Sequence, residues 1–309
     1  MANKVEFYYD SADLITKIHA IKWVPDGEIK CILQIAHGML EHIERYDEFA
    51  NAMADLGIVV SGNDHLGHGS SLINEECRGF FSEGDGNKVV IDDMNKLNTI
   101  LKEEYPNASY FILGHSMGSF LVRQYITIYN SGINGAIIVG TGHQPYALLK
   151  TGLIITKLIA TFKGWRYRSK FVNNLAIGNN NKKFQPSRTN VDWLSRDKKI
   201  VDEYIKDKKI KFIFTLNSYY NMFKGMLTLY DDNNLKKMLK DLPIILLSGD
   251  QDPVGNFGKD IVILYDKYKK LGIKDVSYIL YKEDRHEILN ELDREKVYKD
   301  IGDWILHHM

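Results

Sequence analysis

Several features that would point to a specialised class of protein are scarce in this sequence. There are only two cysteines, Cys31 and Cys77, which excludes a disulfide framework. Cys31 lies in an apolar run, where a buried free thiol is expected. Charge of one sign is not in excess either, because 40 basic and 40 acidic residues give 40 − 40 = 0. The chain therefore lacks the electrostatic footprint of a general nucleic-acid binder, and we expect no nucleic-acid partner.

Long hydrophobic runs are also missing. Residues 1–6 show no apolar segment after a basic start, so no signal peptide is predicted and a cytoplasmic location is the default. The most apolar stretch, residues 148–162, contains two lysines and is shorter than the ~20 residues of a membrane span. There is no internal repeat and no low-complexity tract. The 309 residues are enough to bury a large core.

Apolar strands alternate with helical patterns along most of the chain. Two strands joined by a turn open it, at 5–11 and 16–24. Further strands are expected at 29–36, 58–60, 109–113, 135–140, 244–247 and 276–281, and helices at 46–56, 88–105, 117–130, 258–271 and 293–306. Strands that are apolar on both sides predict an α/β fold, with a mostly parallel sheet covered by helices on both faces.

One long segment interrupts this alternation. Residues 142–241 contain no strand of the core type, and a hundred residues are too many for a simple connection. We therefore predict one core domain, formed by residues 1–141 and 242–309, with a helical insertion at 142–241.

A candidate nucleophile follows the strand at 109–113. Gly114-His115-Ser116-Met117-Gly118 fits the G-x-S-x-G pattern, with a strand before it and a helix after it. A sharp turn presents the serine hydroxyl above the sheet, and glycines permit the close packing around it. A serine becomes nucleophilic when a base lies within hydrogen-bond reach. We predict that Ser116 is the nucleophile rather than a helix cap.

The base is expected to be a histidine late in the chain, because this motif implies the order nucleophile, acid, histidine. After Ser116 the histidines are His143, His286, His307 and His308. His143 comes before any acid on a later strand, and the last two lie at the chain's end, where fraying is expected. His286 follows the last strand and is the predicted base.

The acid is expected after the strand at 244–247, where Asp250 and Asp252 are both candidates. Asp250 lies at the turn itself, where aspartate commonly bonds its own backbone. Asp252 precedes Pro253, which holds the backbone extended. We favour Asp252 as the residue that accepts from the histidine and fixes its tautomer.

Two backbone N–H groups would complete this site as an oxyanion hole. Met117 would supply one, as the residue after the nucleophile, and Met39 in the turn after the strand at 29–36 would supply the other. A metal was the alternative for the nearby histidines, namely His65 and His68 beside Asp64, or His37 with His42. The glycines between them predict shaped turns instead, so we predict no metal and no cofactor, with water as the second substrate.

Several motifs together resemble the lysophospholipase and monoacylglycerol lipase branch of the α/β-hydrolase fold. They are His37-Gly38-Met39-Leu40-Glu41-His42, Asn63-Asp64-His65-Leu66-Gly67-His68-Gly69-Ser70, Gly114-His115-Ser116-Met117-Gly118-Ser119, Arg285-His286-Glu287-Ile288-Leu289-Asn290-Glu291 and, in the insertion, Asp192-Trp193-Leu194-Ser195-Arg196-Asp197. The resemblance covers nearly the whole chain. It implies an eight-stranded core, a helical cap and the same triad. Leu40 departs from it, because a small residue is usual there.

The expected substrate is a small acyl ester, most simply a single-chain lipid such as a monoacylglycerol or lysophospholipid. In the insertion, residues 146–162 predict an amphipathic helix with two lysines on one face and an apolar face formed by Leu148, Gly152, Ile155, Ile159 and Phe162. The apolar face packs on the core, or it covers an acyl chain and touches a lipid surface through the lysines. The alternatives are a short-chain esterase, a peptidase or amidase, and a non-catalytic binding module.

Overall fold

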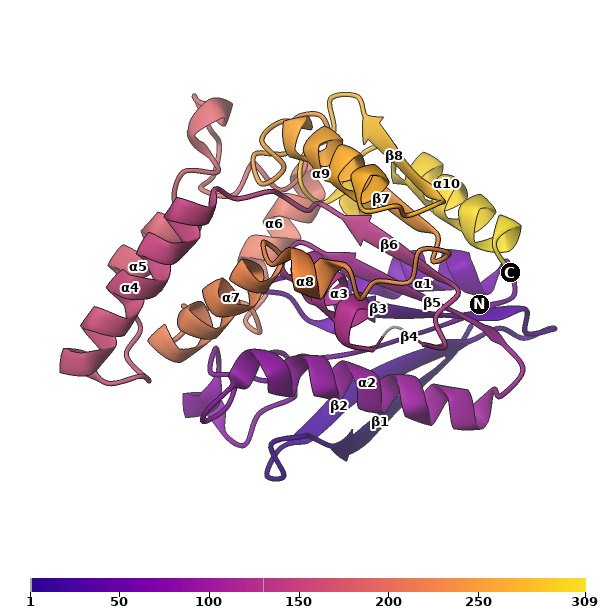
Figure 1. The fold of residues 1–309 in the computed structure, drawn as a ribbon, viewed down its shortest axis with the longest axis horizontal. Helices are drawn as coiled ribbons and strands as arrows, with labels where there is room; N and C mark the ends of the chain where they lie inside the picture. The colour runs from indigo at the N-terminus through magenta and orange to yellow at the C-terminus, as the bar shows by residue number, and fades with distance from the viewer. Residues whose placement is uncertain (1, 130) are drawn as a thin grey trace.

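A computed structural model describes residues 2–129 and 131–309 (Figure 1). Its central sheet has eight strands in the order β1-β2-β4-β3-β5-β6-β7-β8. They are β1 (Asn3–Asp10), β2 (Lys17–Val24), β3 (Cys31–Ala36), β4 (Ile58–Asn63), β5 (Ser109–His115), β6 (Gly135–Val139), β7 (Ile244–Gly249) and β8 (Val276–Tyr281). Strands β3 to β8 are parallel, whereas β2 is antiparallel to both of its neighbours. The mostly parallel sheet predicted from the sequence is confirmed.

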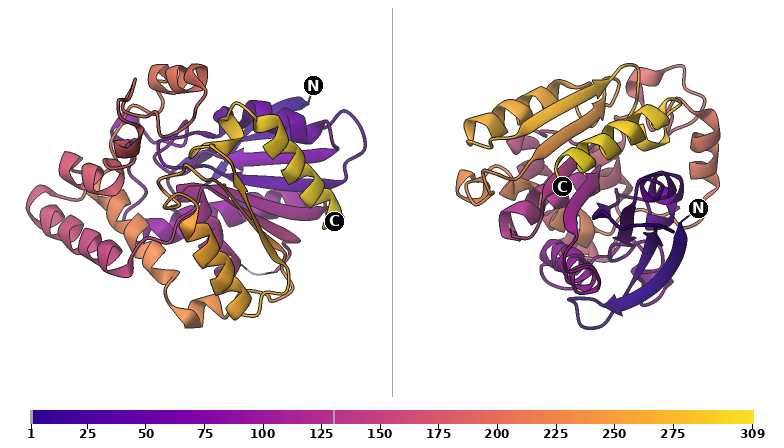
Figure 2. Two further views of the ribbon diagram at one scale, coloured as in Figure 1. Left: turned by 90° about the horizontal axis from the view of Figure 1, so that it is seen from above. Right: turned by 90° about the vertical axis from the view of Figure 1, so that its right-hand side faces the viewer.

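Helices cover both faces of this sheet (Figure 2). On one face lie α1 (Asp47–Ala54) and α10 (Arg294–His307), and on the other α2 (Gly86–Glu104), α3 (Met117–Ile128) and α9 (Lys259–Lys270). Strand β3 is apolar on both faces because its successive side chains pack into opposite cores, with Ile32 in one core and Leu33 in the other. The helix predicted over 117–130 ends at Ile128, and Asn130 lies outside the described residues.

Only helices and irregular chain occupy the described residues between β6 and β7. The helices are α4 (Tyr146–Lys163), α5 (Lys170–Ile177), α6 (Lys198–Lys206), α7 (Leu216–Thr228) and α8 (Asp232–Leu235). Helix α7 packs against α2 and α3, while α4 packs against α5 and α7. Figure 1 shows α4 and α5 on the side of the molecule farthest from both chain ends. Short 3₁₀ turns are at Ile43–Tyr46, Glu75–Cys77, Lys182–Phe184 and Ile288–Asn290.

Helix α4 buries part of the predicted apolar face together with the residues beside it. Its buried residues are Leu149, Gly152, Thr156 and Ala160. Of the predicted face, Gly152 is buried and Ile155 and Ile159 pack partly buried against the core, whereas Leu148 and Phe162 are 45% and 80% exposed. Helix α7 approaches closely at this point, since a Cβ atom at Gly152 would lie only 3.2 Å from the Phe223 ring.

The described residues contain no helix that combines the length and the apolar character needed to cross a membrane.

Candidate active site

Ser116 occupies a strained turn between β5 and α3. Its φ of 52° and ψ of −118° are unusual for a residue with a side chain. The Ser116 N–H donates to the Val139 carbonyl at 3.0 Å, which ties the turn to β6. A Cβ atom at Gly114 would lie 2.3 Å from the Gly118 carbonyl oxygen, and one at Gly118 would lie 1.9 Å from that of Ala36. Both glycines of the motif are therefore required by close backbone contacts.

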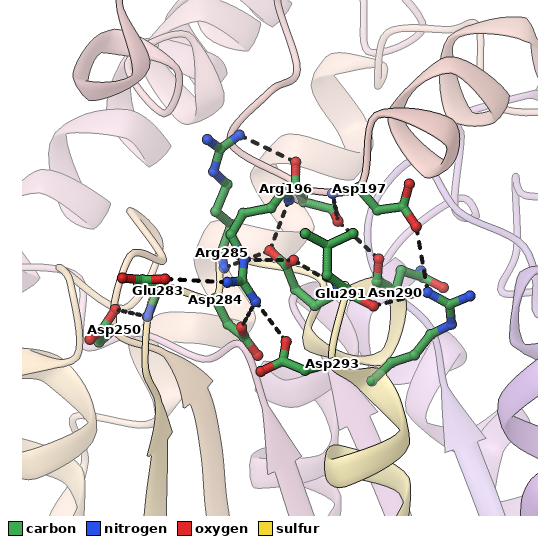
Figure 3. A network of polar contacts seen from close by, with 12 residues as sticks. Arg196, Asp197, Asp250, Glu283, Asp284, Arg285, Asn290, Glu291 and Asp293 are labelled. Carbon is green, nitrogen blue, oxygen red and sulfur yellow. Dashed lines mark hydrogen bonds and ion pairs between the residues drawn. The ribbon is translucent and has the colours of Figure 1, made fainter.

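The structure brings Asp252, and not Asp250, to His286. His286 Nδ1 lies 3.0 Å from each carboxylate oxygen of the fully buried Asp252. The Val254 N–H donates to Asp252 Oδ1 at 2.8 Å and so helps to orient this carboxylate. Asp250 turns to the neighbouring loop, where it accepts from the Glu283 N–H at 2.8 Å (Figure 3). Asp252 therefore bonds the imidazole of His286, whereas Asp250 caps a turn.

A buried ion-pair network, which was not predicted from the sequence, lies behind the His286 loop. His115 Nδ1 donates to Glu41 at 3.1 Å, and His115 Nε2 donates to the His286 carbonyl at 3.3 Å. Burial lowers the pKa of His115, but the facing Glu41 carboxylate outweighs it and the net pKa is raised. Burial likewise opposes ionisation of Glu41, yet His115 and Arg45 hold its pKa well below the usual range. Arg45 also forms a two-pronged ion pair with Glu287, at 2.8 and 3.0 Å.

The same Glu41 carboxylate shapes the turn after β3. It accepts the Gly38 N–H at 2.5 Å and the Tyr46 hydroxyl at 3.0 Å. In the same turn, Leu40 adopts a left-handed backbone conformation with a φ of 56°. Within residues 2–129 and 131–309, no acceptor bonds the Met39 or Met117 N–H. These are the two donors that the sequence suggested, and both residues line the cavity that holds Ser116.

That cavity has a volume of about 810 Å³, within the range of small-molecule sites. Ser116 and His286 lie on its wall. One part of the lining is apolar and comes from α3, α4 and α7: Phe120, Leu148, Leu149, Met222, Phe223 and Met226. Another part is polar: Asn179, Asn181, Gln185, Asn190, Tyr204 and Glu287. The cavity therefore offers both apolar and hydrogen-bonding side chains beside Ser116.

The candidate metal ligands do not assemble into a site. The rings of His37, His65 and His68 pack against one another tilted or edge-on, with centroids 4.2 Å apart for the first two and 5.1 Å for His37 and His68. In the described part of the chain, the one converging group of three potential ligands is Asp284, Glu291 and Asp293. The Arg196 guanidinium already bonds all three of these carboxylates (Figure 3).

Comparison with known proteins assigns the family. Residues 27–293 match the family described as serine aminopeptidase, S33. The chain belongs to this family. It is 26% identical to a mouse monoglyceride lipase, over 93% of this chain and 86% of the relative, and 23% identical to a monoacylglycerol lipase of Mycolicibacterium smegmatis, over 93% and 92%. The structure of a thermostable carboxyl esterase from Bacillus coagulans superposes with a TM-score of 0.92 at 26% identity, covering 100% of this chain and 99% of that one.

These findings place the S33 chain in the monoacylglycerol lipase branch of the α/β-hydrolases and make it a serine ester hydrolase. They favour an enzyme over the non-catalytic binding module that the sequence left open.

Gly118→Ala tests the packing of the nucleophile turn. The added methyl would overlap the Ala36 carbonyl oxygen, so we expect the free energy of unfolding to fall by about 3 kcal/mol. Urea unfolding followed by circular dichroism measures this. Gly27→Ala is the matched control, since a Cβ atom there meets nothing within 4 Å, and its change should stay within about 0.5 kcal/mol. Equal stability of the two variants would contradict the packing argument.

His68→Asn tests the buried histidine cluster. Burial, reinforced by His37, lowers the pKa of His68 to about 3. Because the unfolded chain takes up this proton below about pH 6.5, the unfolded state is favoured as the pH falls from there toward 3. His68 should account for about 2 kcal/mol of the stability lost between pH 7 and pH 5, and the Asn variant should lack that loss.

Urea unfolding at the two pH values measures it, with the exposed His307→Asn as control. A His68→Asn variant that loses as much stability as the wild type would refute the assignment.

Proposed function

We propose that the enzyme hydrolyses single-chain acyl esters through an acyl-enzyme on Ser116. The observation that carries the proposal is the cavity of about 810 Å³ at this serine, whose lining combines apolar side chains from α3, α4 and α7 with polar side chains. A monoacylglycerol needs both kinds of partner, because it has one flexible acyl chain and one small hydroxylated head group. The lipases and the esterase among the relatives support the same class of substrate.

The proposed chemistry uses His286 as the base. Its Nε2 takes the proton of Ser116 Oγ as that oxygen attacks the ester carbonyl carbon, while Asp252 holds Nδ1–H and stabilises the imidazolium. The Met39 and Met117 N–H groups stabilise the oxyanion. Collapse of the tetrahedral intermediate breaks the bond to the leaving alcohol, which receives the proton from His286. Water then attacks the acyl-enzyme by the same route and releases the fatty acid and Ser116.

The acyl chain would lie along the apolar lining. Phe120 and Leu149 are buried core residues. Leu148 is more exposed, and Met222 adds an unbranched, flexible side chain. Methionine adapts its shape to irregular apolar partners, which suits a chain with many conformations.

The polar lining favours an uncharged head group. Asparagines and Tyr204 offer hydrogen bonds to hydroxyls, and the charges of Glu287 and Glu41 on the same wall are paired with Arg45. Lys182 is the one lysine or arginine on the wall formed by the described residues. A phosphate would meet only this one cation there, so monoacylglycerols should be preferred over lysophospholipids.

Residues 142–241 would then serve as a cap on the core formed by residues 1–141 and 242–309. Helix α4 carries Leu148 and Gly152 on the cavity wall and Ile154, Leu158 and Phe162 toward the outside. Exposed Lys150 and Lys157 accompany the outward apolar residues. This pattern is typical of a helix that rests on a lipid surface, and we propose transient membrane contact through it.

A second candidate is amide cleavage, which the description of the matching family favours. An aminoacyl p-nitroanilide, tested beside the esters, separates the two activities.

A chain-length profile tests the substrate class. Hydrolysis of p-nitrophenyl esters from acetate to palmitate should be fastest at medium or long chains, because those fill the apolar lining. Ser116→Ala should remove this turnover at every length, and the exposed Ser70→Ala should leave it unchanged. A maximum at acetate would contradict the lipid substrate and favour a short-chain esterase.

The choice of acid is tested by a pair of substitutions. Asp252→Asn should lower kcat by about 10⁴-fold, because the imidazole then presents the wrong tautomer to Ser116. Asp250→Asn should stay within about twofold, since Asp250 only caps the neighbouring turn. Steady-state kinetics on the best ester measures both. Comparable losses in the two variants would show that the acid is assigned wrongly.

A further inference from the structure

Residues 192–197, here called the strap, run from the insertion onto the loop that carries His286. The His286 N–H donates to the Trp193 carbonyl at 3.3 Å, and the Glu287 N–H donates to the Leu194 carbonyl at 2.8 Å. Ser195 Oγ donates to the Asn290 carbonyl at 2.9 Å. The strap is thus bonded to the backbone of the base itself.

Arg196 of the strap joins it to the acidic side chains of that loop (Figure 3). Its backbone N–H and its Nε donate to the two oxygens of Glu291, at 2.9 and 3.0 Å. Its Nη2 pairs with Asp284 and, at 2.6 Å, with Asp293. The side chains of Glu291 and Asp284 are fully buried, while that of Arg196 is 22% exposed.

The contacts continue to the residue next to the base. Glu291 Oε1 also accepts the Arg285 N–H at 3.0 Å, so one carboxylate holds both the strap and the residue before His286. The Arg285 guanidinium bonds elsewhere, to the Ser195 carbonyl at 3.2 Å, and it lies over the Phe184 ring. Arg196 is therefore the cation that pairs directly with Asp284, Glu291 and Asp293, and its Nη1 also lies 3.7 Å from Glu283.

Asp284 is only partly satisfied by this ion pair. Its buried Oδ2 has no hydrogen-bond partner among the described residues. Burial and the nearby Asp293 and Glu291 raise the pKa of Asp284 to about 8. Without Arg196, the buried Glu291 carboxylate would lose its ion-pair partner directly beside the base, and the loop would have to move to solvate it.

The strap also touches the imidazole. The Trp193 ring lies 4.9 Å from the His286 ring and lines the cavity. Any shift of the strap would therefore change the packing of the base as well as its backbone bonds.

We propose that Arg196 is a positioning residue for ester hydrolysis, which ties the strap to the His286 loop and so fixes the imidazole relative to Ser116 and Asp252. This inference rests on the proposed function of that triad.

The test compares Arg196→Gln and Arg196→Lys with the matched control Arg188→Gln. Arg188 is an exposed arginine of the insertion whose partner, Asp202, is also exposed. Each variant is assayed on the best p-nitrophenyl ester, at a temperature where circular dichroism shows it fully folded. A displaced base slows the chemical step and leaves substrate binding intact, and displacements of about 1 Å cost up to about 10²-fold.

The expected result for Arg196→Gln is a kcat lower by about 30-fold with KM within about twofold. Arg196→Lys keeps the charge without the forked geometry, so its kcat should fall only about 5-fold. Arg188→Gln should match the wild type. A folded Arg196→Gln with wild-type kcat would overturn the proposal, even at a lower Tm, because that would show a role in stability alone. If the Gln variant does not fold, a wild-type kcat in Arg196→Lys would overturn it.

A wild-type protein with no Ser116-dependent ester turnover would contradict the proposed function instead. In that case hydrogen–deuterium exchange of residues 284–291 still decides whether Arg196 holds the loop. Faster exchange in Arg196→Lys than in Arg188→Gln supports that role, and equal exchange in the two variants would overturn it.

Discussion

The turn at Ser116 keeps a backbone conformation that costs free energy, of the order of 1–3 kcal/mol, and the surrounding structure must supply it. Close packing around the turn offsets this free-energy cost. Gly118 packs directly against the end of β3, and Gly114 packs directly against Gly118. These contacts require a fixed distance between β3, β5 and α3. The two apolar cores on either side of the sheet set that distance. Placement of the serine hydroxyl thus depends on packing across the whole sheet.

The other parts of the site are arranged around this turn at the carboxyl ends of the parallel strands. Asp252 and His286 follow β7 and β8, and the Glu41 turn follows β3. Glu41 links its own turn to His115, which is the residue before the serine, and His115 bonds the His286 carbonyl. The ion pairs therefore connect the three loops that would carry the base, the nucleophile and the oxyanion donors. Buried and paired charges of this kind favour one geometry over its alternatives.

The sequence predicted the residues whose spacing reflects the topology. Ser116, Asp252 and His286 could be ordered because parallel strands bring their carboxyl ends to one edge, and the structure does bring Asp252 to His286. Prolonged apolar strands predicted a sheet covered on both faces for the same reason. Local sequence patterns were enough to predict the elements whose contacts are local or repeat from one strand to the next.

Contacts that join distant segments could not be predicted. Arg196 and Glu291 are 95 residues apart, and nothing in either neighbourhood indicates the other. The predicted face of α4 was wrong in part, because hydrophobicity alone ranks Phe162 above Thr156 as a core residue, whereas the structure buries Thr156 and leaves Phe162 80% exposed. For Arg45 and Glu287, charged residues inside apolar motifs were a signal, but their partners became visible only in three dimensions.

Covalent trapping tests the central claim most directly. The protein is treated with a long-chain alkyl fluorophosphonate, digested, and mapped by mass spectrometry in the wild type and in His286→Ala. The account predicts one adduct, on the peptide that contains Ser116, formed rapidly in the wild type and lost or strongly slowed without the imidazole. An unlabelled Ser116, or an adduct confined to another serine, would contradict it.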